Sequence, residues 1–144
     1  MQKDNSIEDI RKNKKIKVIG IGGSGCNTIS RLSALAMEGI ELIAANTDSY
    51  SLSVSTADRV ILLGENITSG YGAGGDVQLG RSAAEESYKT IIGCIQDADI
   101  LFLTAGLGGG TGSGAIEIIA RIATSLGILT ISNVTLPFSF EAES

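Results

Sequence analysis

The chain has 144 residues, 43% of them hydrophobic, and a formal net charge of −5. This length suits one domain with a single core, and no apolar run approaches the ~18 residues that a membrane-spanning helix needs. The sequence contains no histidine, which excludes Ser-His and Cys-His nucleophile pairs and the common histidine zinc sites.

Residues 1–14 are polar and charged and lack the apolar region of a signal peptide. The chain has two cysteines, too few for a disulfide framework, so we expect a cytoplasmic protein. Residues 1–17 carry six basic and three acidic side chains, whereas the rest of the chain carries five and thirteen. This acidic body lacks the clustered lysines and arginines of a nucleic-acid groove, which excludes nucleic acid as a partner. We interpret residues 1–14 as a solvated extension; a contact with a partner or a membrane surface is the alternative.

The remaining residues alternate between strand and helix patterns. In chain order, the predicted elements are a strand over 15–20, a helix over 25–37, strands over 42–45 and 60–63, a turn-rich stretch over 64–75, a helix over 77–96 capped by Asp76, a strand over 100–104, a helix over 114–125 and a strand over 128–134. The continuously apolar strand over 100–104 is typical of one buried on both faces. The order predicts an α/β fold with a doubly wound parallel sheet, in which ligands bind beyond the carboxyl ends of the strands.

Glycine is about twice as frequent as usual, with 19 residues. Fifteen of them fall within 20–25 (GIGGSG), 70–80 (GYGAGGDVQLG) and 106–114 (GLGGGTGSG), each beside a predicted strand end or helix start. Glycine lets backbone N–H groups approach a ligand, and a helix N-terminus adds free donors and partial positive charge. Three such loops at one sheet edge predict a polyphosphate site built from backbone. The sequence has no GxxxxGK[ST] run, which excludes a Walker-type P-loop.

The first glycine stretch taken alone allows a different interpretation. It matches GxGxxG, and Asp48 follows 23 residues after Gly25, close to the ~20 expected in an NAD-binding Rossmann domain. An NAD-dependent oxidoreductase is therefore an alternative. The second glycine stretch has no role in that hypothesis.

The string GLGGGTGSG resembles the signature of the tubulin/FtsZ family of GTPases. Four further segments match the family in order and spacing over 16–141: GIGGSGCN (20–27), NTD (46–48), GAGG with RSAAEES (72–87) and VTLPFSFE (134–141). The likeness is greatest to the FtsZ branch, which acts in cell division, and the GAGG, QDAD and TLPF details lean toward its archaeal members. The resemblance implies a Rossmann-like GTPase domain over 15–144 that binds GTP or GDP with Mg²⁺.

The resemblance also implies roles for individual residues. The α- and β-phosphates would be lined by Gly22, Gly23, Ser24, Gly25, Cys26 and Asn27. The γ-phosphate would meet Ala73, Gly74 and Gly75. The signature would wrap the phosphates, with the Thr111 hydroxyl as an extra donor, through Gly108, Gly109, Gly110, Thr111, Gly112 and Ser113.

Three acceptors complete the implied site. Asn46 and Asp48 would lie near the phosphates and a Mg²⁺ ion held mostly through water, and Glu141 would accept from the ribose hydroxyls. Two of the assigned residues have simpler interpretations, since Asp48 could only cap a turn and Cys26 could pack as a small hydrophobe.

Family members polymerise head to tail, and the next subunit completes the hydrolytic site with an acidic loop. That loop, the guanine-contacting residues and the C-terminal domain follow the segment that matches this chain. We therefore expect no catalytic residue here, weak nucleotide binding and negligible hydrolysis by this chain alone. In longer form the partners would be other subunits and further division proteins. A non-catalytic nucleotide-binding or filament-capping module is the alternative.

Overall fold

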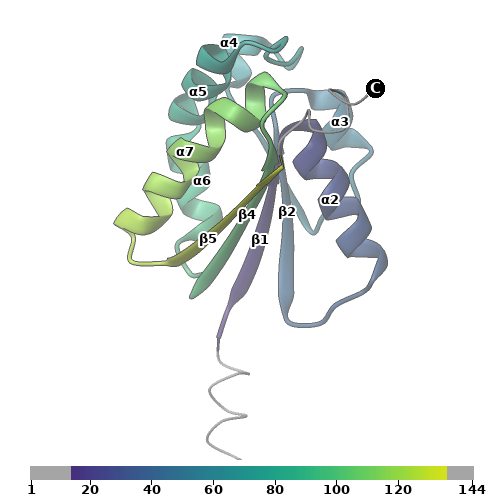
Figure 1. The fold of residues 1–144 in the computed structure, drawn as a ribbon, viewed down its shortest axis with the longest axis vertical. Helices are drawn as coiled ribbons and strands as arrows, with labels where there is room; N and C mark the ends of the chain where they lie inside the picture. Colours follow the sequence, from purple (N-terminus) through teal and green to yellow (C-terminus); the bar gives the residue numbers. More distant parts are fainter. Residues whose placement is uncertain (1–13, 136–144) are drawn as a thin grey trace, which may run out of the picture.

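The computed structural model describes residues 14–135, which form a five-stranded parallel sheet in the order β3-β2-β1-β4-β5. The strands are β1 (Ile16–Ile21), β2 (Ile40–Asn46), β3 (Arg59–Leu62), β4 (Ile100–Gly106) and β5 (Leu129–Thr135). Helices lie on both faces (Figure 1), so the predicted doubly wound sheet is confirmed. The extension predicted over 1–14 and the segment containing Glu141 lie almost entirely outside the described residues.

Helices α2 and α3 lie on one face of the sheet, and α5, α6 and α7 lie on the other (Figure 1). The bounds are α2 (Gly22–Ala34), α3 (Ser49–Ser53), α4 (Glu65–Thr68), α5 (Val77–Glu86), α6 (Tyr88–Ile95) and α7 (Gly110–Ser125). None of the helices described is long and apolar enough to cross a membrane. The short α4 lies in the stretch over 64–75, which was predicted to be rich in turns.

Two helices begin earlier than predicted. Helix α2 starts at Gly22 rather than at residue 25, and α7 starts at Gly110 rather than at residue 114. The sequence predicts later helix starts because glycine disfavours helix by about 1 kcal/mol relative to alanine. Tertiary packing overrides this preference, so two of the glycine-rich loops are partly helical first turns.

The single helix predicted over 77–96 is wrong, because the chain breaks it at Ser87. The Ser87 hydroxyl accepts a hydrogen bond from Gly64 N at 2.9 Å. The neighbouring Glu86 carboxylate accepts from Asn66 N and Ile67 N, both at 3.1 Å, at the start of α4. Glu86 therefore holds the start of α4 against the end of α5.

The sheet face on the α2 side is covered only in part. Val18 and Leu42 are buried under α2, but Phe102 and Ile131, at the same level of the sheet, are 39% and 43% exposed. Leu129 on the edge strand is 59% exposed. The prediction that the strand over 100–104 is buried on both faces is therefore wrong for this side of β4, where no described helix covers it.

Helices α5 and α7 pack backbone against backbone. A Cβ atom on Gly114 would lie 2.5 Å from Arg81 N and nearer still to the Val77 carbonyl. A Cβ atom on Gly80 would lie 2.9 Å from Thr111 Cα. Any side chain at these two positions would push the helices apart, so these glycines serve packing rather than ligand approach.

We predict that Gly114→Ala lowers the free energy of unfolding by about 2–3 kcal/mol, because the added methyl group meets backbone that cannot move aside. Gly93→Ala in α6 is the matched control, since a Cβ atom there has nothing within 4 Å. It should leave stability unchanged or raise it by up to about 1 kcal/mol. Urea unfolding of both variants checks this, and equal stability of the two would contradict the packing role.

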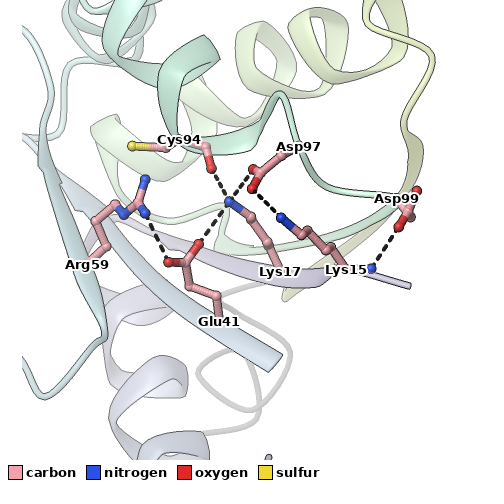
Figure 2. Close-up of polar contacts among 7 residues, drawn as sticks. All are labelled: Lys15, Lys17, Glu41, Arg59, Cys94, Asp97 and Asp99. Carbon is pink, nitrogen blue, oxygen red and sulfur yellow. Dashed lines mark hydrogen bonds and ion pairs between the residues drawn. The ribbon is translucent and has the colours of Figure 1, made fainter. Parts of the chain in front are cut away.

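A buried lysine joins the strands at the amino edge of the sheet (Figure 2). Lys17 Nζ donates to the Cys94 carbonyl at 2.6 Å and pairs with Asp97 at 2.6 Å and Glu41 at 3.0 Å. Glu41 also pairs with Arg59 at 3.2 Å. Burial lowers the pKa of Lys17, but its bonds to Asp97 and Glu41 outweigh burial and raise that pKa above 10.5. The charged lysine thus ties β1, β2 and the turn after α6 together.

We predict that Asp97 makes folding sensitive to acid. Hydrogen bonds from Lys17 and then Lys15 hold the pKa of Asp97 at about 2, below its ordinary value of 3.8. A carboxylate whose pKa is lower in the folded state stabilises the fold fully at pH values above its unfolded-state pKa. This stabilisation is lost as the pH falls through the folded-state pKa. The gap in melting temperature between wild type and Asp97→Asn should therefore shrink from about pH 5 to about pH 2.

The exposed residue Glu85 supplies the control variant, Glu85→Gln, which removes one carboxylate away from the Lys17 network. Thermal unfolding at low salt, followed by circular dichroism, measures both gaps, because salt screens a half-exposed carboxylate. A gap for Asp97→Asn that does not change with pH would show that the ion pairs add no acid sensitivity.

Candidate functional site

The three glycine stretches meet at the carboxyl edge of the sheet. The first turns of α2 and α7 touch, since a Cβ atom on Gly22 would lie 3.0 Å from Gly112 N. The second stretch lies against α7, since a Cβ atom on Gly110 would lie 2.7 Å from the Gly75 carbonyl carbon. This edge is where an open parallel sheet binds its ligands, as the sequence predicts.

Two helices present uncapped N-termini at this edge. The residues that precede α2 and α7, Ile21 and Gly109, make no side-chain capping bond, and neither first turn contains an acidic residue. Helices α3 and α5, by contrast, are capped by the carboxylates of Asp48 and Asp76. The first N–H groups of α2 and α7 therefore have no partner within the helix, and the helix dipoles add partial positive charge. Such a pair of ends suits an anion.

The site glycines fall into two groups. In one group, backbone packing leaves no room for a Cβ atom. A Cβ atom on Gly25 would lie 2.6 Å from Thr104 O, and one on Gly112 would lie 2.7 Å from Gly106 O. In the other group a Cβ would meet nothing within 4 Å, which leaves the backbone open to an approaching group. The open positions are Gly23, Gly74, Gly75 and Gly109. Sequence reasoning assigned all of these glycines to the ligand and missed the packing role of the first group.

Side chains of the NTD triplet mostly shape the loop itself. Asn46 is buried, and its side-chain oxygen accepts from Thr47 N at 2.8 Å. Asp48 accepts from Tyr50 N at 2.9 Å and from the Ser51 hydroxyl at 3.0 Å, which caps α3. The simpler interpretation of Asp48 as a cap therefore describes what the structure contains. Its carboxylate is half-buried at the same sheet edge as the uncapped helices.

Thr47, in the middle of that triplet, is a residue that sequence reasoning missed. It is fully buried, and its hydroxyl lies 2.6 Å from the Thr111 hydroxyl at the start of α7. Its carbonyl accepts from Gly72 N at 3.2 Å and the Thr68 hydroxyl at 3.4 Å. Thr47 thus touches both of the later glycine stretches. Its place between two polar residues at a strand end was the only signal in the sequence.

Cys26 is a packing residue. Its Sγ atom is buried 3.8 Å from Gly20 O and 3.7 Å from Ala45 O, beside Ala44 and Leu52. Burial raises the pKa of the Cys26 thiol to about 11, so the thiol is neutral at physiological pH. The simpler interpretation holds for this side chain, and Cys26 can meet a ligand only through its backbone.

The other predicted residues differ in what they can still offer a ligand. Ser24 and Asn27 are exposed, and Asn27 lines a cavity of about 210 Å³ between α2 and α3. Ser113 donates its N–H to Gly109 O at 3.2 Å and its hydroxyl to Leu107 O at 2.6 Å. Both donors of Ser113 are therefore used inside the loop. Ala73 is buried and its carbonyl accepts from Asp76 N, which closes the turn around Gly74 and Gly75.

No group of three or more Cys, Asp or Glu side chains within residues 14–135 is arranged to hold a metal ion. A cation at this edge would need ligands supplied by a bound anion and water. Mg²⁺ commonly binds in this way, with one or two carboxylates and phosphate oxygens.

Comparison with known proteins places this geometry in a family. The family described as Tubulin/FtsZ family, GTPase domain, matches residues 15–144. The cell division protein FtsZ of Coxiella burnetii is 51% identical over 132 residues, which is 92% of this chain and 34% of that protein. FtsZ 1 of the archaeon Pyrococcus furiosus is 46% identical over 94% of this chain and 36% of that protein. Bacterial and archaeal relatives thus match at similar levels, so the archaeal lean stays a prediction.

Solved structures of the same family have the same fold as this chain. The empty FtsZ dimer of M. jannaschii superposes with a TM-score of 0.88 at 45% identity, over 97% of this chain and 41% of that chain. CetZ2 from Haloferax volcanii, solved as a GTPγS-bound protofilament, gives a TM-score of 0.74 at 26% identity. The match covers 83% of this chain and 39% of that chain. The chain therefore spans about a third of the length of the curated relatives it matches. The family does not favour the oxidoreductase alternative: the chain belongs to the tubulin/FtsZ family, and residues 15–144 match its GTPase domain.

Proposed function

We propose that this chain is the nucleotide-binding part of a filament-forming GTPase of the FtsZ type, which acts in cell division in the cytoplasm. Similarity to FtsZ proteins over more than nine tenths of the chain supports the proposal. The observation that carries it is the pair of uncapped helix ends at α2 and α7, which touch at the carboxyl edge of the sheet. The ligand is GTP or GDP.

Backbone donors bind the phosphates in this proposal. The N–H groups of the first turns of α2 and α7 point toward a shared anion, and the open glycines at 23, 74, 75 and 109 let it come close. The hydroxyls of Ser24 and Thr111 add donors. Asn46 and Asp48 lie near the phosphates, and Glu141, outside the described residues, accepts from the ribose. Neutral donors suit this acidic domain, because fixed dipoles stabilise negative charge without a lysine.

Mg²⁺ would neutralise charge on the phosphates. Asp48 is the carboxylate best placed to face the ion's water shell, since it is half-buried at this edge. Its present bonds to Tyr50 N and Ser51 leave each oxygen with a second lone pair.

Hydrolysis needs a group that this part of the chain does not supply. Asp48 and Asp76, the carboxylates that flank the site, both cap helices. The described residues therefore position and stabilise the phosphates, and a neighbouring subunit completes the reaction through a head-to-tail contact. The chain alone binds nucleotide weakly and hydrolyses it negligibly. Self-association is supported by the dimer and protofilament forms of the FtsZ and CetZ2 structures, and other division proteins are further partners.

A nucleotide panel tests this function. We predict that Mg-GDP and Mg-GTP raise the melting temperature of the chain, by about 5–10 °C for a ligand at 100 times its dissociation constant. Mg-ATP and NAD are measured in parallel. Equal shifts with ATP would place base selection outside this chain. A shift with NAD alone, or no shift with any nucleotide, would contradict the proposal.

A carboxylate at the start of α7 should compete with the phosphates. We predict that Gly109→Asp keeps or slightly raises stability, by up to about 0.5 kcal/mol, because Gly109 has extended backbone at an N-cap position with open space around it. The same variant should bind Mg-GDP at least about tenfold more weakly, because like charges would meet at the site. Calorimetric titration measures the affinity.

Gly93→Asp is the control for the charge change, since Gly93 lies on α6 with open space around it and away from the carboxyl edge. Its affinity for Mg-GDP should match that of wild type. If Gly109→Asp also binds like wild type, the α7 N-terminus does not hold the phosphates.

A further inference from the structure

We infer that Thr47 is a positioning residue for nucleotide binding: its buried hydroxyl donates to Thr111 Oγ1 and so leaves the Thr111 proton free for a phosphate oxygen. This inference rests on the proposed function. It assigns a direction to the 2.6 Å hydrogen bond between the two hydroxyls, in which either atom could be the donor.

Burial decides the direction. Both residues are buried, Thr47 at 0% and Thr111 at 7% exposed, but Thr111 lies in the first turn of α7 at the open edge of the sheet. Among the residues that the structure describes, Thr111 is the hydrogen-bond partner of the Thr47 hydroxyl. If Thr111 were the donor, the Thr47 proton would be buried without an acceptor, at a cost of about 1–3 kcal/mol. Thr47 therefore donates, and Thr111 accepts.

The direction matters because a hydroxyl carries a single proton. With Thr47 as donor, the Thr111 proton stays available to another acceptor, and Thr111 lies in the first turn of α7 at the open edge of the sheet. A bond from this hydroxyl to a phosphate oxygen would be charge-assisted and therefore strong. The chain of bonds from Thr47 through Thr111 to the anion would also polarise each hydroxyl in the same sense.

The same residue links the two later glycine stretches. The Thr47 carbonyl accepts from Gly72 N and the Thr68 hydroxyl, and the adjacent Asp48 forms an antiparallel bridge with Tyr71. Thr47 thus connects the segment before Gly74 and Gly75 to the first turn of α7. Loss of its hydroxyl would release Thr111 while leaving these backbone contacts in place.

Five variants separate this role from simple packing. Thr47→Val removes the hydroxyl at nearly constant shape, and Thr47→Ser retains it. Thr68→Val is the matched control, since its buried hydroxyl donates to the Thr47 carbonyl but does not touch Thr111. Thr111→Val, alone and combined with Thr47→Val, completes a double-mutant cycle. Affinity for Mg-GDP is measured by calorimetric titration of the full chain, and stability is measured separately by urea unfolding.

We expect Thr47→Val to bind Mg-GDP about tenfold more weakly than wild type, which corresponds to one charge-assisted hydrogen bond. Thr47→Ser and Thr68→Val should stay within about threefold of wild type. Adding Thr47→Val to Thr111→Val should change the affinity by less than about twofold, because Thr47 acts through Thr111.

Three results would overturn the inference while leaving nucleotide binding intact: wild-type affinity in Thr47→Val, an equal loss in Thr68→Val, or a full additional loss in the double variant. Absence of Mg-GDP binding by the wild-type chain would instead overturn the proposed function, and this inference with it. If Thr47→Val does not fold, hydroxyl protons observed by NMR in the wild-type chain decide the matter. The Thr47 proton should exchange with water more slowly than the Thr111 proton, and the reverse order would contradict the assignment.

Discussion

The structure depends on how closely the first turn of α7 approaches its neighbours. Gly110 lies against the backbone of Gly75 and Asp76, and Gly112 lies against Gly106 and the first turn of α2. No side chain fits in these contacts, so the glycine signature is first a packing requirement. The same contacts bring together the first turn of α7, the first turn of α2 and the turn at Gly74 and Gly75. Packing and the proposed phosphate binding therefore depend on one constraint.

Much of the fold could be predicted from the sequence, because strand and helix periodicity are local signals. The break at Ser87 could not, since it depends on Gly64, 23 residues earlier in the chain. The early starts of α2 and α7 were missed for the same reason: their glycines are stabilised by contacts with distant backbone. Within the site, the location was predictable from strand ends, but the division between packing glycines and open ones required three-dimensional distances. Thr47 could not be assigned from sequence, because its place between two polar residues at a strand end does not reveal that its hydroxyl is buried against Thr111.

The two edges of the sheet use different physical means. At the amino edge, Lys17 is held by two carboxylates and a carbonyl, which gives a cross-strand charge network (Figure 2). At the carboxyl edge, lysine and arginine are absent from the first turns of α2 and α7, and backbone dipoles carry the positive potential. On the α2 side, Phe102, Leu129 and Ile131 form an apolar strip that no described helix covers. Parallel sheets are normally covered on both faces, so this strip is an exception among residues 14–135.

We propose that backbone N–H groups at the starts of α2 and α7 hold the phosphates. Titration of ¹⁵N-labelled chain with Mg-GDP, followed by amide chemical shifts, tests it directly. The amides of Gly23, Gly109 and Gly110 should show large shifts, and those of Lys15 and Lys17 at the opposite edge should not move. Saturable binding that shifts only amides away from the α2 and α7 first turns would contradict the claim.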